Sequence, residues 1–183
     1  RLFRRQRQMC IRDSDNEAQY QELAEHILRE LGTLHGLLHN AGLLGELKPL
    51  GQYDYNMFKE VMAVNVNSNF LLTKSLLPAM ENADSASIIF TSSSVGRLGR
   101  AYWGAYSASK FAVEGLMQVW ADELAGISNI RVNSLNPGAT RTAMRASAYP
   151  AEDRHALPEA ADIMGAYLFL MGDDSRAING QQL

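Results

Sequence analysis

Residues 87–110 read SIIFTSSSVGRLGRAYWGAYSASK and join an apolar run to a helical pattern through a polar turn. The apolar run at 87–92 predicts a buried strand, because a short apolar segment closed by small polar residues is typical of a strand covered on both faces. The residues from 104 to 125 follow a helical pattern, which Gly126 stops. A strand followed by a helix is the building unit of an α/β fold.

The same alternation continues on both sides of this stretch. Apolar runs at 34–39 (LHGLLH) and 130–135 (IRVNSL) predict two further buried strands. Helical spacing predicts three more helices: one from a capping-box pair, Ser14 and Glu17, to Gly32, and two others at 55–80 and 158–171. Helices that alternate with strands apolar on both faces predict an α/β fold with a parallel sheet.

Small and polar residues follow each predicted strand. They are Asn40-Ala41-Gly42, Ser92-Ser93-Ser94 and Asn136-Pro137-Gly138. The carboxyl ends of parallel strands meet at one edge of a sheet, and ligands of open α/β sheets bind beyond that edge. The sequence therefore predicts the functional site there. Residues 143–157 show no regular pattern and are expected to be irregular.

Charge is distributed unevenly along the 183 residues. Five of the 17 basic residues lie within the first twelve positions, which hold no acid, so the rest of the chain is more acidic than the formal net charge of -3 indicates. An acidic body argues against a nucleic-acid surface. We expect residues 1–13 to be a non-native or disordered leader; a nucleic-acid arm or a targeting peptide is the alternative.

The cysteine and hydropathy patterns indicate a cytoplasmic protein. Cys10 is the only cysteine, so no internal disulfide can form, as is usual in a reducing compartment. No apolar run reaches the roughly 18–20 residues that span a bilayer, and no signal peptide is recognisable. The four histidines show no metal-ligand spacing, so no metal site is expected.

Tyr106 and Lys110 stand four residues apart at the start of the predicted 104–125 helix, which places the phenol and the ammonium on one face. A phenol has a pKa of about 10, and a nearby ammonium lowers that pKa by favouring the phenolate. Such a phenol can transfer a proton to or from a substrate oxygen. A solvated helix face produces the same pair by chance, so the pair alone is weak support.

Three further residues give the pair a context. Ser93 lies thirteen residues before Tyr106 at a strand end, where its hydroxyl can hold a substrate carbonyl or simply cap a turn. Asn65 lies in mid-helix, where asparagine is not favoured. It is either solvent-facing or an inward side chain that holds a water. Trp103 either walls the substrate pocket or packs in the core.

A series of motifs makes the sequence resemble the short-chain dehydrogenase/reductase family, in its single-domain branch. They are HNAG at 39–42, NVN at 65–67, SSSVG at 92–96, YSASK at 106–110 and NPGATRT at 136–142. The resemblance covers residues 14–183 and extends to a bacterial subgroup of generically described oxidoreductases. It implies a Rossmann-like, doubly wound parallel sheet and the interconversion of an alcohol and a carbonyl by hydride transfer.

The resemblance also implies roles for individual residues. Tyr106 is then the general acid/base, Ser93 orients the substrate carbonyl, and Lys110 lowers the pKa of Tyr106. Lys110 also contacts the nicotinamide ribose, and Asn65 supports a water-mediated proton relay through Lys110. The cofactor, NAD or NADP, is expected to contact Asn40, Ala41, Gly42, Tyr106, Lys110, Pro137, Gly138, Thr140 and Thr142.

The family likeness carries expectations about substrate and partners as well. The substrate is a small alcohol or carbonyl compound, and residues 143–157 stand where the family has its variable substrate lid. Arg141 and Arg145 either bind an anionic substrate group or form a solvated loop face. The helices predicted at 55–80 and 104–125 are expected to form a homodimer or homotetramer.

One departure from the family is serious. The family begins with a strand and a glycine-rich turn that holds the pyrophosphate, but Gly32 is the first glycine here. We therefore expect residues 14–183 to be a partial domain without its N-terminal half; a natural minimal variant is the alternative. The residue that distinguishes NAD from NADP would be missing too. A catalytically incompetent fragment that keeps only a self-association surface is the alternative function. Too few residues follow Lys110 for the substrate domain of the longer epimerase and dehydratase branch.

Overall fold

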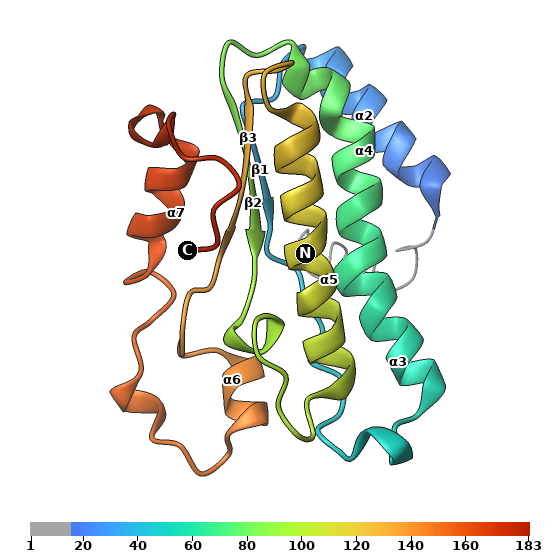
Figure 1. The fold of residues 1–183 in the computed structure, drawn as a ribbon, viewed down its shortest axis with the longest axis vertical. Coiled ribbons are helices and arrows are strands. Elements are labelled where there is room, and N and C mark those ends of the chain that lie inside the picture. Colours follow the sequence, from blue (N-terminus) through green and yellow to red (C-terminus); the bar gives the residue numbers. More distant parts are fainter. Residues whose placement is uncertain (1–15) are drawn as a thin grey trace.

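The structure, a computed structural model, describes residues 16–183, which form one parallel sheet of three strands with helices on both faces (Figure 1). Strands β1 (Gly36–His39), β2 (Ala86–Thr91) and β3 (Ile130–Leu135) pair in the order β1-β2-β3. The leader expected at 1–13 lies outside the described residues.

Helices α4 and α5 cover one face of the sheet, α2 packs against α4, and α7 covers the other face (Figure 1). Cover on both faces explains the apolar strands and confirms the predicted α/β, Rossmann-like doubly wound fold. Between residues 16 and 183, no helix has both the length and the apolar character of a membrane span. The helices are α2 (Glu17–Leu31), α3 (Tyr55–Met62), α4 (Ser68–Glu81), α5 (Gly104–Leu124), α6 (Ala143–Ala148) and α7 (Met164–Met171).

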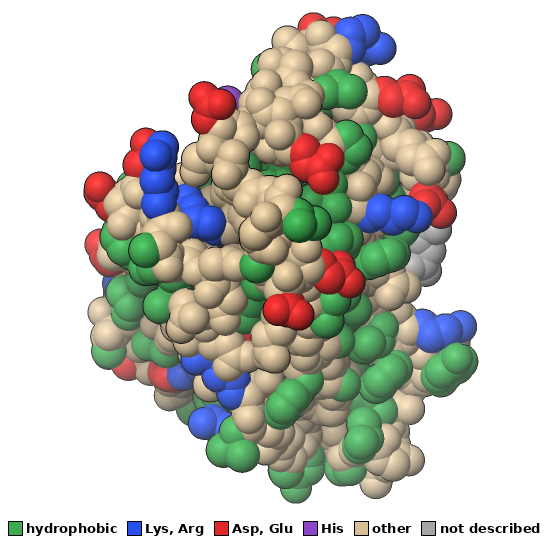
Figure 2. Space-filling model, turned by 45° about the horizontal axis from the view of Figure 1, so that its top comes forward, with side chains coloured by type: hydrophobic (Ala, Val, Ile, Leu, Met, Phe, Trp, Pro, Cys, Tyr) green, Lys and Arg blue, Asp and Glu red, His purple; other side chains and the backbone are tan. Residues whose placement is uncertain are grey.

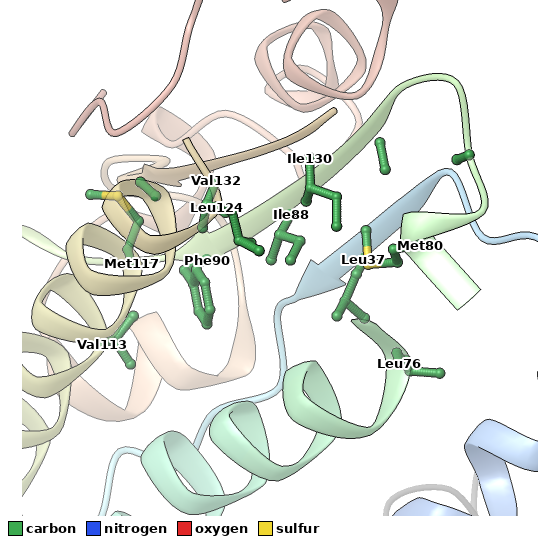
Figure 3. Packing of buried hydrophobic residues seen from close by; sticks show 13 residues of the cluster. Leu37, Leu76, Met80, Ile88, Phe90, Val113, Met117, Leu124, Ile130 and Val132 are labelled. Carbon is green, nitrogen blue, oxygen red and sulfur yellow. The ribbon is translucent and has the colours of Figure 1, made fainter. Parts of the chain in front are cut away.

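Alternate side chains of β2 enter two separate cores, because successive side chains of a strand point to opposite faces. Ile88 and Phe90 lie in the larger core with Leu76 of α4 (Figure 3). Ile89 packs on the other side with Leu170 of α7. All five side chains are almost completely buried. Burial of each side chain contributes about 1.5–3 kcal/mol to the stability of the fold. Because β2 supplies side chains to both cores, it is the central strand of the structure.

Helix α2 begins at Glu17, with Asn16 as its N-cap, and ends at Gly32. The backbone N–H of Gly32 donates to the carbonyl of Leu28 at 2.9 Å. Gly32 has a φ of +69°, a left-handed conformation that glycine adopts without strain. The predicted helix end is therefore confirmed, whereas the predicted capping residue Ser14 lies outside the described residues.

The helix predicted at 55–80 is interrupted by a π-helical turn at Ala63–Asn67, between α3 and α4. The side chain of Asn69 donates to the carbonyl of Asn65 at 2.9 Å. Such bonds from side chains to carbonyls one turn back compete with regular helical bonds. The helical pattern predicted at 55–80 is confirmed, with a π turn at the asparagines that interrupt its apolar spacing. Such turns are frequent at functional sites.

The segment after β3 also differs from its prediction. Residues 143–157, expected to be irregular, contain α6 and a 3-10 turn at Arg154–Ala156. Helix α7 begins at Met164 and not at Pro158. The carbonyl of Pro158 accepts the backbone N–H of Arg141 at 2.8 Å, which ties it to the loop after β3 instead of to a helical turn.

Within the described residues, β1 forms a free edge of the sheet. Leu38 on this strand is 39% exposed. At the opposite edge, Ser134 of β3 donates its N–H to the carbonyl of Gln181 at 2.9 Å and accepts the N–H of Leu183 at 3.0 Å. An uncovered edge such as that of β1 presents unpaired backbone groups to which another strand can bind.

Candidate active site

The carboxyl ends of the three strands lie together at the lower end of Figure 1, where α5 begins and α6 lies. The polar segments 40–42, 92–94 and 136–138 follow these strand ends. Helix α5 carries Tyr106 and Lys110 in its first two turns. The topology therefore brings the predicted motifs to one edge of the sheet, as parallel pairing requires.

Lys110 is buried against the end of β2. Its Nζ donates to the carbonyl of Thr91 at 2.7 Å and lies 5.5 Å from the centroid of the Tyr106 ring. Burial lowers the pKa of Lys110 from 10.5 to about 8, because it disfavours the charged form. The carboxylate of Glu114, one turn further along α5, opposes this effect and raises the Lys110 pKa.

The side chain of Ser93 lies close enough to the Tyr106 phenol to influence its pKa. Burial raises the pKa of the Tyr106 phenol, whereas the hydrogen bond with Ser93 acts in the opposite direction and is the smaller effect. Burial is therefore the largest influence on this phenol. The lowering of its pKa by Lys110, which the carbonyl of Thr91 holds, stays a prediction.

Asn65 lies in the π turn and is fully buried. Its Oδ1 accepts the backbone N–H of Leu43 at 2.7 Å, and its Nδ2 donates to the carbonyl of Leu43 and to Oγ of Ser109, both at 2.9 Å. Both hydrogens of the amide nitrogen are therefore used within the protein. The structure places Asn65 close to Gly42 but shows no direct bond to Lys110, and its part in a proton relay stays a prediction.

Asn40, Ala41 and Gly42 form an exposed segment after β1. The Thr91 hydroxyl donates to Oδ1 of Asn40 at 3.1 Å, which ties this segment to the end of β2. A Cβ added at Gly42 would lie 3.9 Å from Nζ of Lys110. Gly42 therefore lies beside the ammonium of Lys110, where the lack of a side chain leaves its backbone accessible.

The loop after β3 holds the remaining predicted cofactor residues. Gly138 has a φ of +72° and open space around it, and Pro137 beside it is half-buried. The hydroxyl of buried Thr140 donates to the carbonyl of Gly138 at 3.4 Å. Thr142 caps α6, because its Oγ1 accepts the backbone N–H of Arg145 at 3.0 Å. The structure therefore gives both threonines a local bond.

Both arginines of this segment form ion pairs within the protein. Arg145 donates to each carboxylate oxygen of Glu152 at 2.6 Å. Arg141 donates to Glu159 at 2.7 Å. Each guanidinium is already paired with a carboxylate of the protein, so the structure favours the loop-face alternative for both residues.

Sequence reasoning missed three contributors to the site. Ser109 receives a hydrogen bond from Asn65, and its place inside the YSASK motif is a signal that could have indicated it. Tyr149 lies with its ring centroid 5.8 Å from that of Trp103, and it stands in the segment expected to be irregular. The carbonyl of Thr91 holds Lys110, but a backbone group leaves no signature in a sequence.

Comparisons with known proteins identify the family of this chain. The model of the short chain dehydrogenase family matches residues 4–153, a range that begins inside the 1–13 segment. The chain belongs to the short chain dehydrogenase family. It is 56% identical over 160 residues to YciK, an uncharacterized oxidoreductase of Escherichia coli K12. It is 32% identical over 181 residues to the cyclopentanol dehydrogenase of a Comamonas species.

The solved structure of one family member, a short chain dehydrogenase of Escherichia coli CFT073 in complex with NADPH, superposes with a TM-score of 0.89 at 54% identity. That match covers 92% of this chain and 69% of the other. The chain spans 63% of the length of YciK and 72% of the cyclopentanol dehydrogenase, and the matches cover 87% and 93% of this chain. The family resemblance and the Rossmann-like fold are thereby confirmed.

Proposed function

We propose that this protein is an NAD(P)-dependent oxidoreductase that interconverts an alcohol and a carbonyl, with Tyr106 as the general acid/base. The observation that carries the proposal is the convergence of Tyr106, Ser93 and buried Lys110 at one edge of the sheet, with Nζ of Lys110 5.5 Å from the centroid of the Tyr106 ring. Two hydroxyls and an ammonium at the carboxyl edge of a parallel sheet suit a reacting oxygen. One relative is a cyclopentanol dehydrogenase, which supports an alcohol as the substrate class.

The residues at this edge fit a nicotinamide dinucleotide. Gly42 lies beside Lys110 and carries no side chain, which would allow a ribose hydroxyl to approach the ammonium. The family member from strain CFT073 holds NADPH, which supports NADP in preference to NAD. The rest of the dinucleotide would be held by Asn40, Ala41, Pro137, Gly138, Thr140 and Thr142.

Reduction of a carbonyl needs one hydride and one proton. The dinucleotide supplies the hydride to the carbonyl carbon when it is bound. The hydroxyls of Tyr106 and Ser93 hold the carbonyl oxygen, and Tyr106 gives its proton to that oxygen as the C=O bond becomes a single bond. The phenolate of Tyr106 then regains a proton from solvent. Oxidation runs in reverse, with the alcohol proton passing to the phenolate.

Lys110 supports this proton transfer through its charge. The carbonyl of Thr91 holds the ammonium 5.5 Å from the centre of the Tyr106 ring. A positive charge at that place favours the phenolate over the neutral phenol. With a pKa of about 8, Lys110 is mostly charged at neutral pH. The charge therefore offsets part of the burial that raises the pKa of Tyr106.

The exchange Tyr106→Phe tests the proposal in the full-length protein with NADPH. Turnover is expected to fall by about 10²-fold or more, which is what a positioned acid/base group contributes. Binding of NADPH should change little, because the phenol is not the main anchor of the dinucleotide. Tyr55→Phe, at a tyrosine that is 70% exposed on α3, is the control. Near-normal turnover of Tyr106→Phe contradicts the assignment of the proton donor.

Self-association is a second candidate role, and it rests on apolar side chains of α4 and α5. Phe70 is 40% exposed, Phe111 is 47% exposed and Val119 is 54% exposed. Phe70 stacks on Trp120 with ring centroids 6.5 Å apart, so the two helices share one apolar surface. Figure 2 shows hydrophobic side chains gathered on the side that carries α3 and α4.

We propose that this surface forms a homodimer or homotetramer. Light scattering of the full-length protein tests it, and a clean monomer contradicts it. A protein that associates but binds no dinucleotide would instead support the non-catalytic alternative. We also place the protein in the cytoplasm, because its one cysteine fits a reducing compartment.

A further inference from the structure

Trp103 lies between two phenols at the edge of the candidate site. Its ring centroid is 5.9 Å from that of Tyr106 and 5.8 Å from that of Tyr149. Trp103 immediately precedes α5, whereas Tyr149 immediately follows α6. Both residues are only partly buried. We call this pair of rings, Trp103 and Tyr149, the aromatic wall.

Apolar side chains also pack against Tyr106, in addition to the polar groups of Ser93 and Lys110 described above. Leu44 and Val95 are buried against it, and Met144 and Ala148 of α6 pack on the same cluster. Met144 also lies next to Gly42, which follows β1. A Cβ added at Gly42 would be 4.0 Å from the methyl carbon of Met144. A substrate oxygen held by Tyr106 would therefore have carbon and aromatic rings beside it.

Arg145 packs on Tyr149 of the aromatic wall and is already paired with a carboxylate of the protein. Its guanidinium carbon lies 3.8 Å from the ring centroid of Tyr149, while two of its nitrogens donate to Glu152 at 2.6 Å. Arg141 is similarly engaged, with Glu159 at 2.7 Å and the carbonyl of Leu157 at 3.1 Å. A carboxylate placed against the aromatic wall would lose water and would have to compete with Glu152 for the guanidinium of Arg145, which is unfavourable.

Resting on the proposed function, we propose that the aromatic wall selects uncharged ketones and alcohols that carry a carbon ring. A flat or alicyclic ring buries more apolar surface against Trp103 and Tyr149 than an open chain does, and aromatic faces favour such contacts. A carboxylate near the reacting carbon is disfavoured, because the neighbouring arginines are already paired with Glu152 and Glu159. Trp103 and Tyr149 are thus specificity-determining residues that do not touch the transferred proton.

The test compares substrates in the full-length protein with NADPH. Cyclohexanone and 2-hexanone have equal numbers of carbons, and methyl 4-oxocyclohexanecarboxylate differs from its free acid by the charge. We expect kcat/KM to be about tenfold higher for cyclohexanone than for 2-hexanone, and about tenfold or more higher for the ester than for the carboxylate. Equal values within either pair overturn the proposal.

Variants connect the preference to the aromatic wall. Trp103→Leu and Tyr149→Leu should each lower kcat/KM for cyclohexanone by about tenfold and that for 2-hexanone by less than about threefold. Tyr149→Phe keeps the ring and should keep the preference, and Tyr55→Leu on α3 is the remote control. Equal losses on both ketones would show a merely structural role and overturn the proposal.

The failure of the proposed function is recognised separately. If the wild-type protein reduces none of the four ketones, the oxidoreductase proposal is contradicted. Calorimetric binding of cyclohexanone and 2-hexanone to the NADPH-bound protein then decides the role of the aromatic wall without catalysis. The inference is supported if cyclohexanone binds more tightly than 2-hexanone and if Tyr149→Leu abolishes this difference. Equal binding of the two ketones, or no binding of either, overturns it.

Discussion

The side-chain amide of Asn65 bonds to both backbone polar groups of Leu43. Its Oδ1 accepts the Leu43 N–H at 2.7 Å, and its Nδ2 donates to the Leu43 carbonyl at 2.9 Å. The same Nδ2 donates to Ser109, which lies on α5 between Tyr106 and Lys110. One buried residue of the π turn therefore holds the loop after β1 against the helix that carries the proposed catalytic pair.

Asn65→Ala should lower the free energy of unfolding by about 2–3 kcal/mol, because it removes three hydrogen bonds of a fully buried side chain and leaves the groups of Leu43 without these partners. Urea denaturation measures this value. The matched exchange Asn56→Ala, at an exposed position of α3, should change stability by no more than about 0.5 kcal/mol. Equal effects at the two positions would show that Asn65 does not hold the loop.

Lys110→Met should weaken both NADPH binding and turnover, since Lys110 is proposed to contact the ribose and to favour the phenolate. The pH optimum of alcohol oxidation should move upward, because losing a nearby positive charge raises the pKa of Tyr106 further. Steady-state rates across pH and NADPH titrations measure both effects. Lys74→Met, at an exposed position of α4, is the control. An unchanged optimum would argue against an electrostatic role.

Glu114 is a buried carboxylate that raises the pKa of Lys110. Its Oε2 accepts the hydroxyl of Ser134 at 2.6 Å, and its Oε1 lies 3.4 Å from Nε of Arg97. Glu114→Gln keeps the shape and removes the charge, so the pKa of Lys110 should fall below about 8. The rate of carbonyl reduction, which is expected to fall as Lys110 loses its proton at alkaline pH, should then begin to fall at a lower pH.

A pH–rate profile of the full-length protein measures this shift. Glu123→Gln lies on the exposed side of the same helix and should leave the profile unchanged. A profile that is the same in Glu114→Gln and wild type would mean that this carboxylate does not act on Lys110.

His39 makes stability depend on pH. Burial lowers its pKa from 6.5 to about 3, against the opposing hydrogen bond of Asn69, and its ring stacks on Phe90 at 4.6 Å. The unfolded chain therefore binds a proton below about pH 6.5 that the folded chain excludes until about pH 3. The free energy of unfolding should fall as pH decreases through this window, by up to about 1.4 kcal/mol per pH unit.

Urea denaturation at pH 6.5 and pH 5 checks the His39 prediction. His39→Gln should show a weaker dependence than wild type, because glutamine binds no proton. His155→Gln, at an exposed position, should keep the wild-type dependence. The same pH dependence in all three proteins would exclude His39 as the cause.

Local sequence pattern located most of the regular structure. The strand predicted at 130–135 is β3, Ile130–Leu135, and the helix predicted at 104–125 is α5, Gly104–Leu124. Apolar periodicity and glycine act over a few residues, so such elements can be predicted without knowledge of the fold. The motif spacing also placed Tyr106 and Lys110 on one helix face, since a single helix determines that relation.

Other features depend on groups that come from distant parts of the chain. The π turn places Asn65 against Leu43 and Ser109, and the late start of α7 accompanies a bond between Arg141 and Pro158. Burial raises the pKa of Tyr106, an effect that the sequence alone does not reveal. The sequence by itself determined which residues share an element. Only the tertiary structure decided which hydrogen-bond partners each residue has and how deeply it is buried, because both depend on how the elements pack together.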